Sequence, residues 1–332
     1  MGWWQISADT LANSRFVVSP LSEALASLRV LYRGTAAHPG ERAWLDTHLA
    51  AFRDRLAADP VTALLLRAAF GRTWTADFLT PPPTGDQSFE EELARLWDTP
   101  PDAAREQLAY SSGGSLPNEL HRDDLPARAV DLVGWVWTRT VRPDWSRRLR
   151  IIEADIVART AQLTRGGWAS ALDDMRAGMR WLGESRLQIN AYDYPPMDLT
   201  GARLVFVPVT PSWRGWVAYD SSEHHAIVYP CSGVLADVDR AAAPASLRRL
   251  LGPARAGVLV LLGTPKSTTQ LVALTDQGLG SVGRHLRVLL DAHLIGRRRA
   301  GRSVLYYRTA VGDLLVSETS GTIAANVQTF AD

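Results

Sequence analysis

The sequence predicts a mixed α+β protein, mostly α, with two domains. Apolar residues recur at helical spacing through much of the first 180 residues, and shorter apolar runs typical of β-strands follow between 187 and 229. From residue 245 the chain becomes strongly basic. A chain of 332 residues is long enough for about two domains. We therefore expect a helical N-terminal body with a small β-sheet over residues 1–240 and a C-terminal domain over 245–320.

Composition argues against several classes of protein. No apolar run approaches the ~18 residues that a membrane-spanning helix needs, so we expect no membrane partner. The first residues lack a basic stretch followed by an apolar run, which a secretory signal would require. Cys231 is the only cysteine, so no disulfide within the chain is expected. Together these features favour a cytoplasmic protein.

Helices are expected through the first part of the body. A short strand over 16–18 precedes Ser19, a typical N-cap, and Pro20 in the first turn of a helix. Further helices are expected over 41–58 and 60–70, and the proline-rich stretch 80–85 breaks the pattern. Helical spacing resumes near residue 127 and continues to about 179, with interruptions at Pro143 and 166–167. Asp144 or Ser146 is expected to cap the long part of this stretch.

Strands are expected after Trp181. Apolar runs at 187–189, 204–207, 216–219 and 226–229 are separated by turn residues, and Glu223–His225 reads as a hairpin turn. The body should therefore end in a small sheet, with residues 241–244 as a short join to the next domain.

Charge is distributed unevenly along the chain. Residues 245–308 hold eleven Lys or Arg and two Asp, a net charge of +9, whereas the whole chain carries +1. A basic domain beside an acidic body is the electrostatic pattern of a protein that binds a polyanion. A solvated basic face without a partner is the alternative interpretation.

The basic domain has the pattern of a helix-turn-helix. A helix is expected over 247–262, with Gly252-Pro253 as a candidate break. Ser267 is a suitable N-cap for a second helix, and a third should cover 279–292 after a short turn. On the third helix one face is apolar; its members are Val282, Leu286, Leu289 and Leu290.

The opposite face of that third helix is suited to DNA. At helical spacing Gly280, Arg284 and Arg287 point away from the apolar face, with Ser281 beside them. A recognition helix needs this arrangement, because its packed face holds the helix while its arginines reach base edges and phosphates. His285 lies at the edge of the packed face, where it is either structural or a phosphate contact.

A basic hairpin follows the third helix. Leu294 and Ile295 lead into Arg297–Arg299, Ala300-Gly301 forms the turn, and the alternating run 304–308 returns. This is the pattern of a β-wing whose arginines enter the minor groove or contact flanking phosphates. The full set of expected DNA contacts is Lys266, Ser267, Thr268, Gly280, Ser281, Arg284, His285, Arg287, Arg298, Arg299 and Arg302.

These segments resemble the ArsR-type winged-helix repressors. The resemblance rests on residues 251–255, 267–271, 280–286, 289–294 and 301–306, in that order, and covers about the last quarter of the chain. It implies a homodimeric repressor that binds double-stranded DNA at an inverted-repeat operator and leaves it when a signal arrives. It also implies dimer contacts through the first helix of the domain and a helix over 310–317. The body resembles the added N-terminal domain of some ArsR-type regulators.

The sequence departs from the metal-sensing members of that family. The stretch 270–274 has no cysteine, and 311–317 has no histidine. Potential metal ligands cluster in the body, but their spacing matches no metal motif; they are Asp220, Glu223, His224, His225 and Cys231. No phosphate-binding glycine loop or nucleophile elbow is present. We therefore expect no catalytic residues, no cofactor and no bound metal, and a signal that is not a metal.

Tryptophans are the remaining candidates for a ligand site. The chain has twelve, and several cluster in sequence around the expected helix-to-sheet transition. A pocket for a small-molecule effector is one interpretation, and core packing or dimerisation is the other. The pocket candidates are Trp135, Trp168, Trp181, Trp213 and Trp216. An alternative function is an enzyme or ligand-carrier body joined to a winged helix that binds protein.

Overall fold

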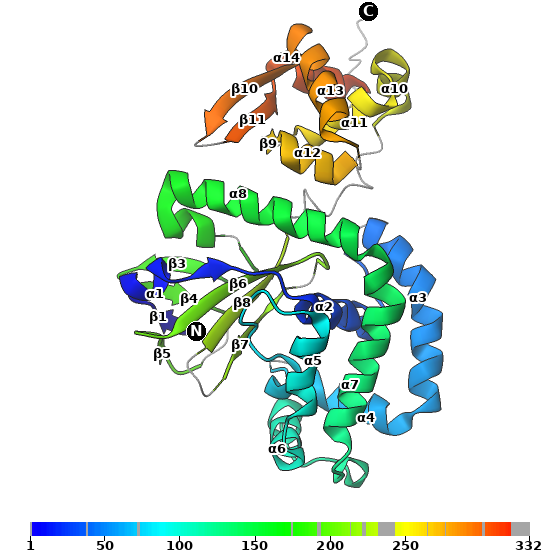
Figure 1. Ribbon diagram of the computed structural model, residues 1–332, viewed down its shortest axis with the longest axis vertical. Coiled ribbons are helices and arrows are strands. Elements are labelled where there is room, and N and C mark those ends of the chain that lie inside the picture. Colours follow the sequence, from blue (N-terminus) through cyan, green and yellow to red (C-terminus); the bar gives the residue numbers. More distant parts are fainter. Residues whose placement is uncertain are drawn as a thin grey trace, which may run out of the picture. The chain divides into compact units, whose positions relative to one another are not determined.

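The computed structural model describes residues 2–37, 39–71, 74–173, 175–190, 194–212, 214–220, 224–231, 243–263, 265–275, 277–300 and 303–319. As predicted, the fold is mixed α+β and mostly helical (Figure 1). The chain divides into two compact units, Met1–Ala236 and Asp237–Asp332. This division lies close to the join expected at 241–244. Among the described residues, no helix combines the length and the hydropathy that a membrane span requires.

The first unit contains most of the helices. Its α-helices are α1 (Ala8–Ala12), α2 (Pro20–Arg33), α3 (Pro39–Ala58), α4 (Pro60–Ala69), α5 (Phe89–Trp97), α6 (Pro101–Ser112), α7 (Leu125–Val136) and α8 (Trp145–Leu172). Four short helical turns join them, η1 (Asp77–Leu79), η2 (Asn118–Leu120), η3 (Trp137–Val141) and η4 (Arg142–Asp144). Helices α2 to α4 lie where the sequence predicts them, and the Ser19 hydroxyl caps α2 by accepting from the Ser22 amide at 3.0 Å. Helices α5 and α6 were not predicted.

Within the described residues, two four-stranded sheets complete the first unit. The larger has the order β2 (Arg15–Phe16), β6 (Arg203–Val209), β8 (His224–Pro230) and β7 (Trp216–Tyr219), with the first three parallel and β7 antiparallel. The smaller has the order β3 (Arg180–Gly183), β4 (Arg186–Gln188), β1 (Trp3–Gln5) and β5 (Met197–Asp198). Strand β8 begins at His224, so the predicted hairpin turn is wrong for His224 and His225. Glu223 lies outside the described residues.

Strand β6 separates two cores. Val205 and Val207 pack with the helical layer of α2 to α7, whereas Leu204 and Phe206 pack with the smaller sheet and the end of α8. Alternate residues of a strand point to opposite faces, so a strand covered on both sides must be apolar throughout. This explains the continuous apolar run of β6, and Figure 1 shows the sheet beneath α8 with the other helices to one side.

Helix α8 is interrupted where the sequence predicts. Gly167 has φ +66° and ψ −171°, a conformation that no helix accommodates. The helix ends at Leu172, earlier than the expected residue 179, because the chain turns into β3. Asp144 stands at the N-cap position but makes no capping hydrogen bond.

The second unit has the order α10 (Ala245–Leu251), α11 (Pro253–Leu261), β9 (Lys266–Ser267), α12 (Thr268–Thr275), α13 (Leu279–Asp291), β10 (Ile295–Ala300), β11 (Ser303–Arg308) and α14 (Ala310–Thr319). Its sheet has the order β10-β11-β9 and is antiparallel. The helix expected over 247–262 is divided at the candidate break Gly252-Pro253 into α10 and α11, because Gly252 adopts φ +80° and ψ 153°. The core of this unit contains Leu247, Val258, Leu259, Leu271, Val282, Leu286, Leu289 and Leu305.

Candidate nucleic-acid interface

A reciprocal cap fixes the start of α12. The Ser267 hydroxyl accepts from the Gln270 amide at 3.2 Å, and the Gln270 side chain accepts from the Ser267 amide at 2.7 Å. This is a capping box, which satisfies two amides that a helix start leaves without partners. The predicted role of Ser267 as an N-cap is therefore confirmed.

Helix α13 has one buried and one exposed face. Val282, Leu286 and Leu289 are at most 2% exposed and hold the helix against α11 and α12. Gly280, Arg284 and Arg287 are exposed, as the spacing predicts, and Ser281 is half-buried. The structure therefore brings the four expected contact residues together along one helix.

Two glycines leave open space on the exposed side of α13. A Cβ atom added at Gly280 or Gly283 would meet no heavy atom within 4 Å. Packing within the chain therefore does not require glycine at either position. A backbone without side chains at these points lets another molecule approach the helix closely.

His285 is held in a polar row along α13. The Gln277 side-chain oxygen lies 3.1 Å from the Ser281 hydroxyl, which lies 3.3 Å from His285 Nε2. Partial burial lowers the pKa of His285, and the charges of Arg255 and Arg284 lower it further. The imidazole is therefore neutral at pH 7, which favours the structural role over a charged phosphate contact.

The hairpin of β10 and β11 presents three exposed arginines, Arg297, Arg298 and Arg299. Arg298 lies opposite Leu305 in the register, and Arg299 lies opposite Val304. Because successive residues point to opposite faces of a hairpin, Arg297 and Arg299 share one face and Arg298 lies on the other. Arg297 was not among the DNA contacts expected from the sequence, although the alternation of side chains along a strand places it on the same face as Arg299. Arg302 lies outside the described residues.

Lys266 and Thr268 occupy different environments at the start of α12. Lys266 is 2% exposed, and burial lowers its pKa to about 8, with a further contribution from Arg308. Ser267 is 5% exposed and is used in the cap. The side chains of Lys266 and Ser267 do not lie on the exposed surface that Arg284 and Arg287 form. The burial of Lys266 and Ser267 therefore does not favour the DNA contacts that were predicted for them. Thr268 is half-buried.

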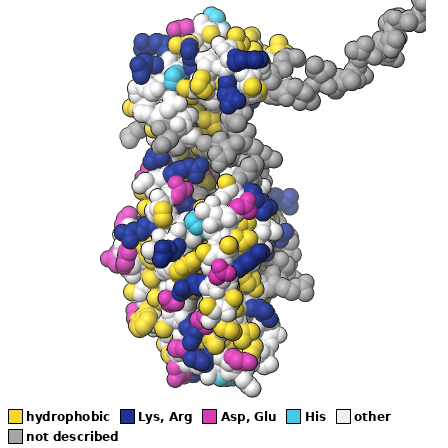
Figure 2. Space-filling model, turned by 90° about the vertical axis from the view of Figure 1, so that its right-hand side faces the viewer, with side chains coloured by type: hydrophobic (Ala, Val, Ile, Leu, Met, Phe, Trp, Pro, Cys, Tyr) yellow, Lys and Arg dark blue, Asp and Glu magenta, His cyan; other side chains and the backbone are white. Residues whose placement is uncertain are grey.

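The charge of this unit differs from that of the first. On the face shown in Figure 2, Lys and Arg side chains are more frequent than Asp and Glu on the C-terminal unit, whereas acidic and basic side chains are interspersed on the N-terminal unit. The ion pair between Arg308 and Asp313, at 2.9 Å, neutralises one of the basic residues. Arg284, Arg287 and the three hairpin arginines appear in no ion pair among the described residues.

The tryptophans proposed for a ligand pocket do not form one site. Trp135 and Trp216 belong to the core on the helical side of the larger sheet. Trp168 and Trp181 pack in the core on the other side, where Trp168 stacks on Phe206 at a centroid distance of 5.3 Å. Trp213 lies outside the described residues. The four described tryptophans therefore pack in two separate cores, divided by the sheet.

Potential metal ligands are dispersed among the described residues. His224 Nδ1 lies 3.7 Å from Asp220, while His225 packs edge-on against Trp4 and Cys231 is buried. Within the described ranges, no three His, Cys, Asp or Glu side chains are grouped as a metal site would need. In comparisons with protein-family models, curated proteins and solved structures, none matches the chain.

Proposed function

We propose that the C-terminal unit is a winged helix-turn-helix and that the protein is a sequence-specific, DNA-binding transcription regulator. In this proposal α12 and α13 form the helix-turn-helix, α13 is the recognition helix, and β10 with β11 forms the wing. One observation carries the proposal. Helix α13 buries Val282, Leu286 and Leu289 while Gly280, Arg284 and Arg287 stay exposed. That division leaves a full helix face, free of packing within the unit, for the major groove.

Electrostatics support double-stranded DNA as the partner. Residues 245–308 carry a net charge of +9, and exposed arginines occur both on α13 and on the hairpin. Arginine binds guanine edges in a bidentate manner and also contacts phosphates. Two separate basic elements match a helix in one groove and a hairpin beside it.

A homodimer is part of the proposal. Helix α10 packs against α14, and these helices expose Leu250, Val311 and Leu314 by 65%, 58% and 61%. Apolar side chains this exposed favour burial against a partner. They lie on the two helices that the resemblance to ArsR-type repressors implies for dimerisation. We propose a repressor that binds an inverted repeat and is released by a signal other than a metal.

The test begins with capture of genomic fragments by the purified protein at physiological salt, followed by footprinting of the enriched fragments. A protected inverted repeat is the expected result. The double variant Arg284→Ala/Arg287→Ala should then lose binding by about 1–3 kcal/mol for each base contact removed. Arg139→Ala/Arg142→Ala, which removes two exposed charges from the first unit, is the control and should bind normally.

Two results would contradict the proposal. Normal operator binding by the α13 double variant would show that this helix does not read DNA. Weak binding without sequence preference and with little salt dependence would favour a protein-binding module instead, because contacts with phosphates release counterions and weaken steeply with salt.

A further inference from the structure

The carboxyl ends of β2 and β6 meet at one edge of the larger sheet, where a cavity lies within the first unit. The two strands are parallel neighbours, so the residues that follow them come together. Thr210 and Pro211 follow β6, and α2, which carries Glu23, follows β2. Crevices outside the carboxyl ends of parallel strands are common ligand sites. This cavity does not involve the tryptophan set considered above.

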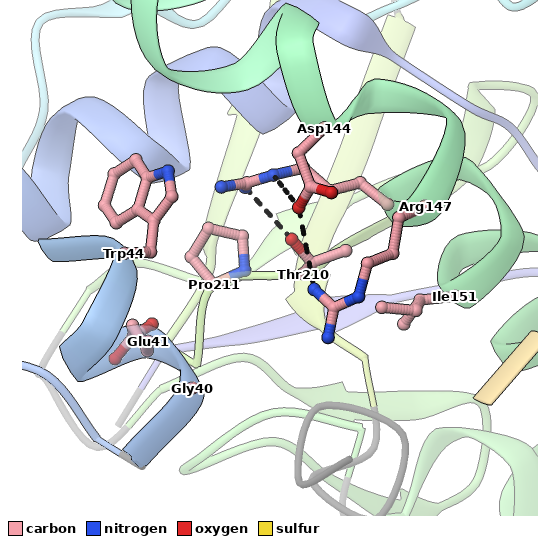
Figure 3. Close-up of a pocket in the computed structure, with 9 residues that line it drawn as sticks. Gly40, Glu41, Trp44, Asp144, Arg147, Ile151, Thr210 and Pro211 are labelled. Carbon is pink, nitrogen blue, oxygen red and sulfur yellow. Dashed lines mark hydrogen bonds and ion pairs between the residues drawn. The ribbon is translucent and has the colours of Figure 1, made fainter. Parts of the chain in front are cut away.

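The cavity is small and has two kinds of wall. Its volume is about 70 Å³, whereas one water needs about 10–15 Å³. Trp44, Ile151 and Pro211 form an apolar side (Figure 3). The polar side is formed by Arg147, Arg148 and Thr210 together with the carboxylates of Glu41 and Asp144. A molecule with a short apolar part and one polar group fits both walls in size and chemistry.

Arg148 is fixed on the polar side. Its Nη1 donates to Glu23 at 2.6 Å, and to the hydroxyls of Ser27 and Thr210 at 3.1 Å each. Its guanidinium lies 5.2 Å from the centre of the Trp44 ring. The side chain is 7% exposed and Glu23 is fully buried. The guanidinium is therefore held in one orientation before any ligand arrives.

One donor of this guanidinium is unsatisfied. Arg148 Nε is buried and has no hydrogen-bond partner among the residues that the structure describes. Besides Glu23, the carboxylate of Asp144 lies near the guanidinium, with its Oδ2 3.9 Å from Arg148 Nε and 3.5 Å from Arg147 Nη1. Figure 3 shows this carboxylate joined to the Arg147 guanidinium by a dashed line. Charged hydrogen bonds are about 2.7–2.9 Å long, so Asp144 approaches both donors without bonding closely to either.

We propose that this cavity binds a small carboxylate whose oxygens accept from Arg148 Nε and Arg147 while its apolar part lies against Trp44 and Ile151. A carboxylate supplies the acceptor that the buried Nε lacks, and it can contact both arginines at once. Without the ligand, Glu23 is the close partner of Arg148, and Asp144 lies 3.5 Å from Arg147. The ligand is either a simple carboxylic acid or an amino acid, because both carry this group.

Calorimetric titration of the full chain without DNA tests the proposal. The probes are acetate, butyrate and benzoate in one arm, and alanine, valine and phenylalanine in the other. At least one probe should bind, and Arg147→Ala should weaken that probe by about tenfold, as expected for a lost charged hydrogen bond. Arg142→Ala, which removes an exposed arginine outside the cavity, should leave binding unchanged.

Asp144→Ala separates the two sources of the carboxylate. If the ligand is a simple acid, removal of the competing anion should tighten binding. If it is an amino acid, loss of a partner for the ammonium group should weaken binding. Arg148 itself is left intact, because its removal would leave the Glu23 carboxylate buried without its cation. Failure of all six probes to bind, or equal binding by wild type and Arg147→Ala, would overturn the proposal. Neither result bears on DNA recognition.

Discussion

Glu92 is a buried acid that supports the start of α2. Its carboxylate accepts from the Leu21 amide at 2.8 Å. Burial raises the pKa of Glu92 to about 7, although hydrogen bonds from Leu21 and Ser19 and the charge of Arg95 oppose the shift. The sequence alone marks Glu92 as one of several acids in α5, and only the packing distinguishes it from its exposed neighbours.

This shift predicts a pH-dependent stability. The folded state holds the Glu92 proton more tightly than the unfolded state, so stability should fall as pH rises from about 4.5 to about 7. Glu92→Gln removes that penalty. Its stability relative to wild type should therefore increase over this window, by an amount on the order of 3 kcal/mol at most. Urea unfolding at pH 5 and pH 8 measures the difference.

Glu91 on the same helix provides the control. Its pKa is lowered by hydrogen bonds from Ser88, so Glu91→Gln should show a small trend in the opposite direction. Asp77, whose pKa burial raises to about 6, titrates in both proteins and cancels in the comparison. A Glu92→Gln protein with the same pH dependence as wild type would show that Glu92 does not titrate in this range.

At the scale of elements, α13 combines modest helix propensity with an exposed basic face. Gly280 and Gly283 weaken the helix, yet neither is required by contacts within the chain. Glycines that weaken a helix, and that packing within the chain does not require, are consistent with a partner that approaches the helix closely. The cost is partly offset by the apolar face, which α11 and α12 cover.

Gly283→Ala should separate folding from DNA binding. The added methyl group meets open space, so the variant should gain about 0.5–1 kcal/mol of stability. If α13 lies in the major groove, the same methyl group should lower DNA affinity. Gly257→Ala in α11 also meets open space and should stabilise the protein without changing affinity. Thermal unfolding and operator titration measure the two effects, and unchanged DNA affinity in Gly283→Ala would count against close contact at this point of α13.

At the scale of the whole molecule, the two units differ in net charge and in architecture. The C-terminal unit has its own core and sheet, and its residues 245–308 carry a net charge of +9, whereas the whole chain carries +1. The N-terminal unit contains two sheets, two cores and the cavity beside Arg148. DNA reading and ligand binding are thus proposed for different units, and each can be tested without the other.

Assembly into a dimer should depend on α10 and α14. Leu250→Asp/Leu314→Asp places charges on two exposed apolar positions, so it should leave folding intact and produce a monomer. Binding to an inverted repeat should then weaken by about a hundredfold, because the second half-site no longer benefits from linkage. Light scattering and operator titration provide the readouts. Trp97→Asp, at a 60% exposed position of α5, is the control, and a double variant that remains dimeric would place the interface elsewhere.

The sequence by itself determined features that depend on near neighbours. Ser19 and Ser267 cap helices because a hydroxyl reaches an amide three residues away, and both caps are readable from the sequence. The two faces of α13, the break at Gly167 and the apolar strand β6 follow from local periodicity and backbone preference. The mixed, mostly helical fold follows from the same signals.

Only the tertiary structure decided features that join distant segments. Strands β1 and β2 enter sheets whose other strands lie about 180 residues later, and no local pattern specifies such partners. The tryptophans separate into two cores because β6 and β8 run between them. Likewise, Trp44, Arg148 and Thr210 line one cavity only because α3, α8 and the end of β6 meet there. Burial and pairing depend on those long-range contacts, which side-chain spacing along the chain does not encode.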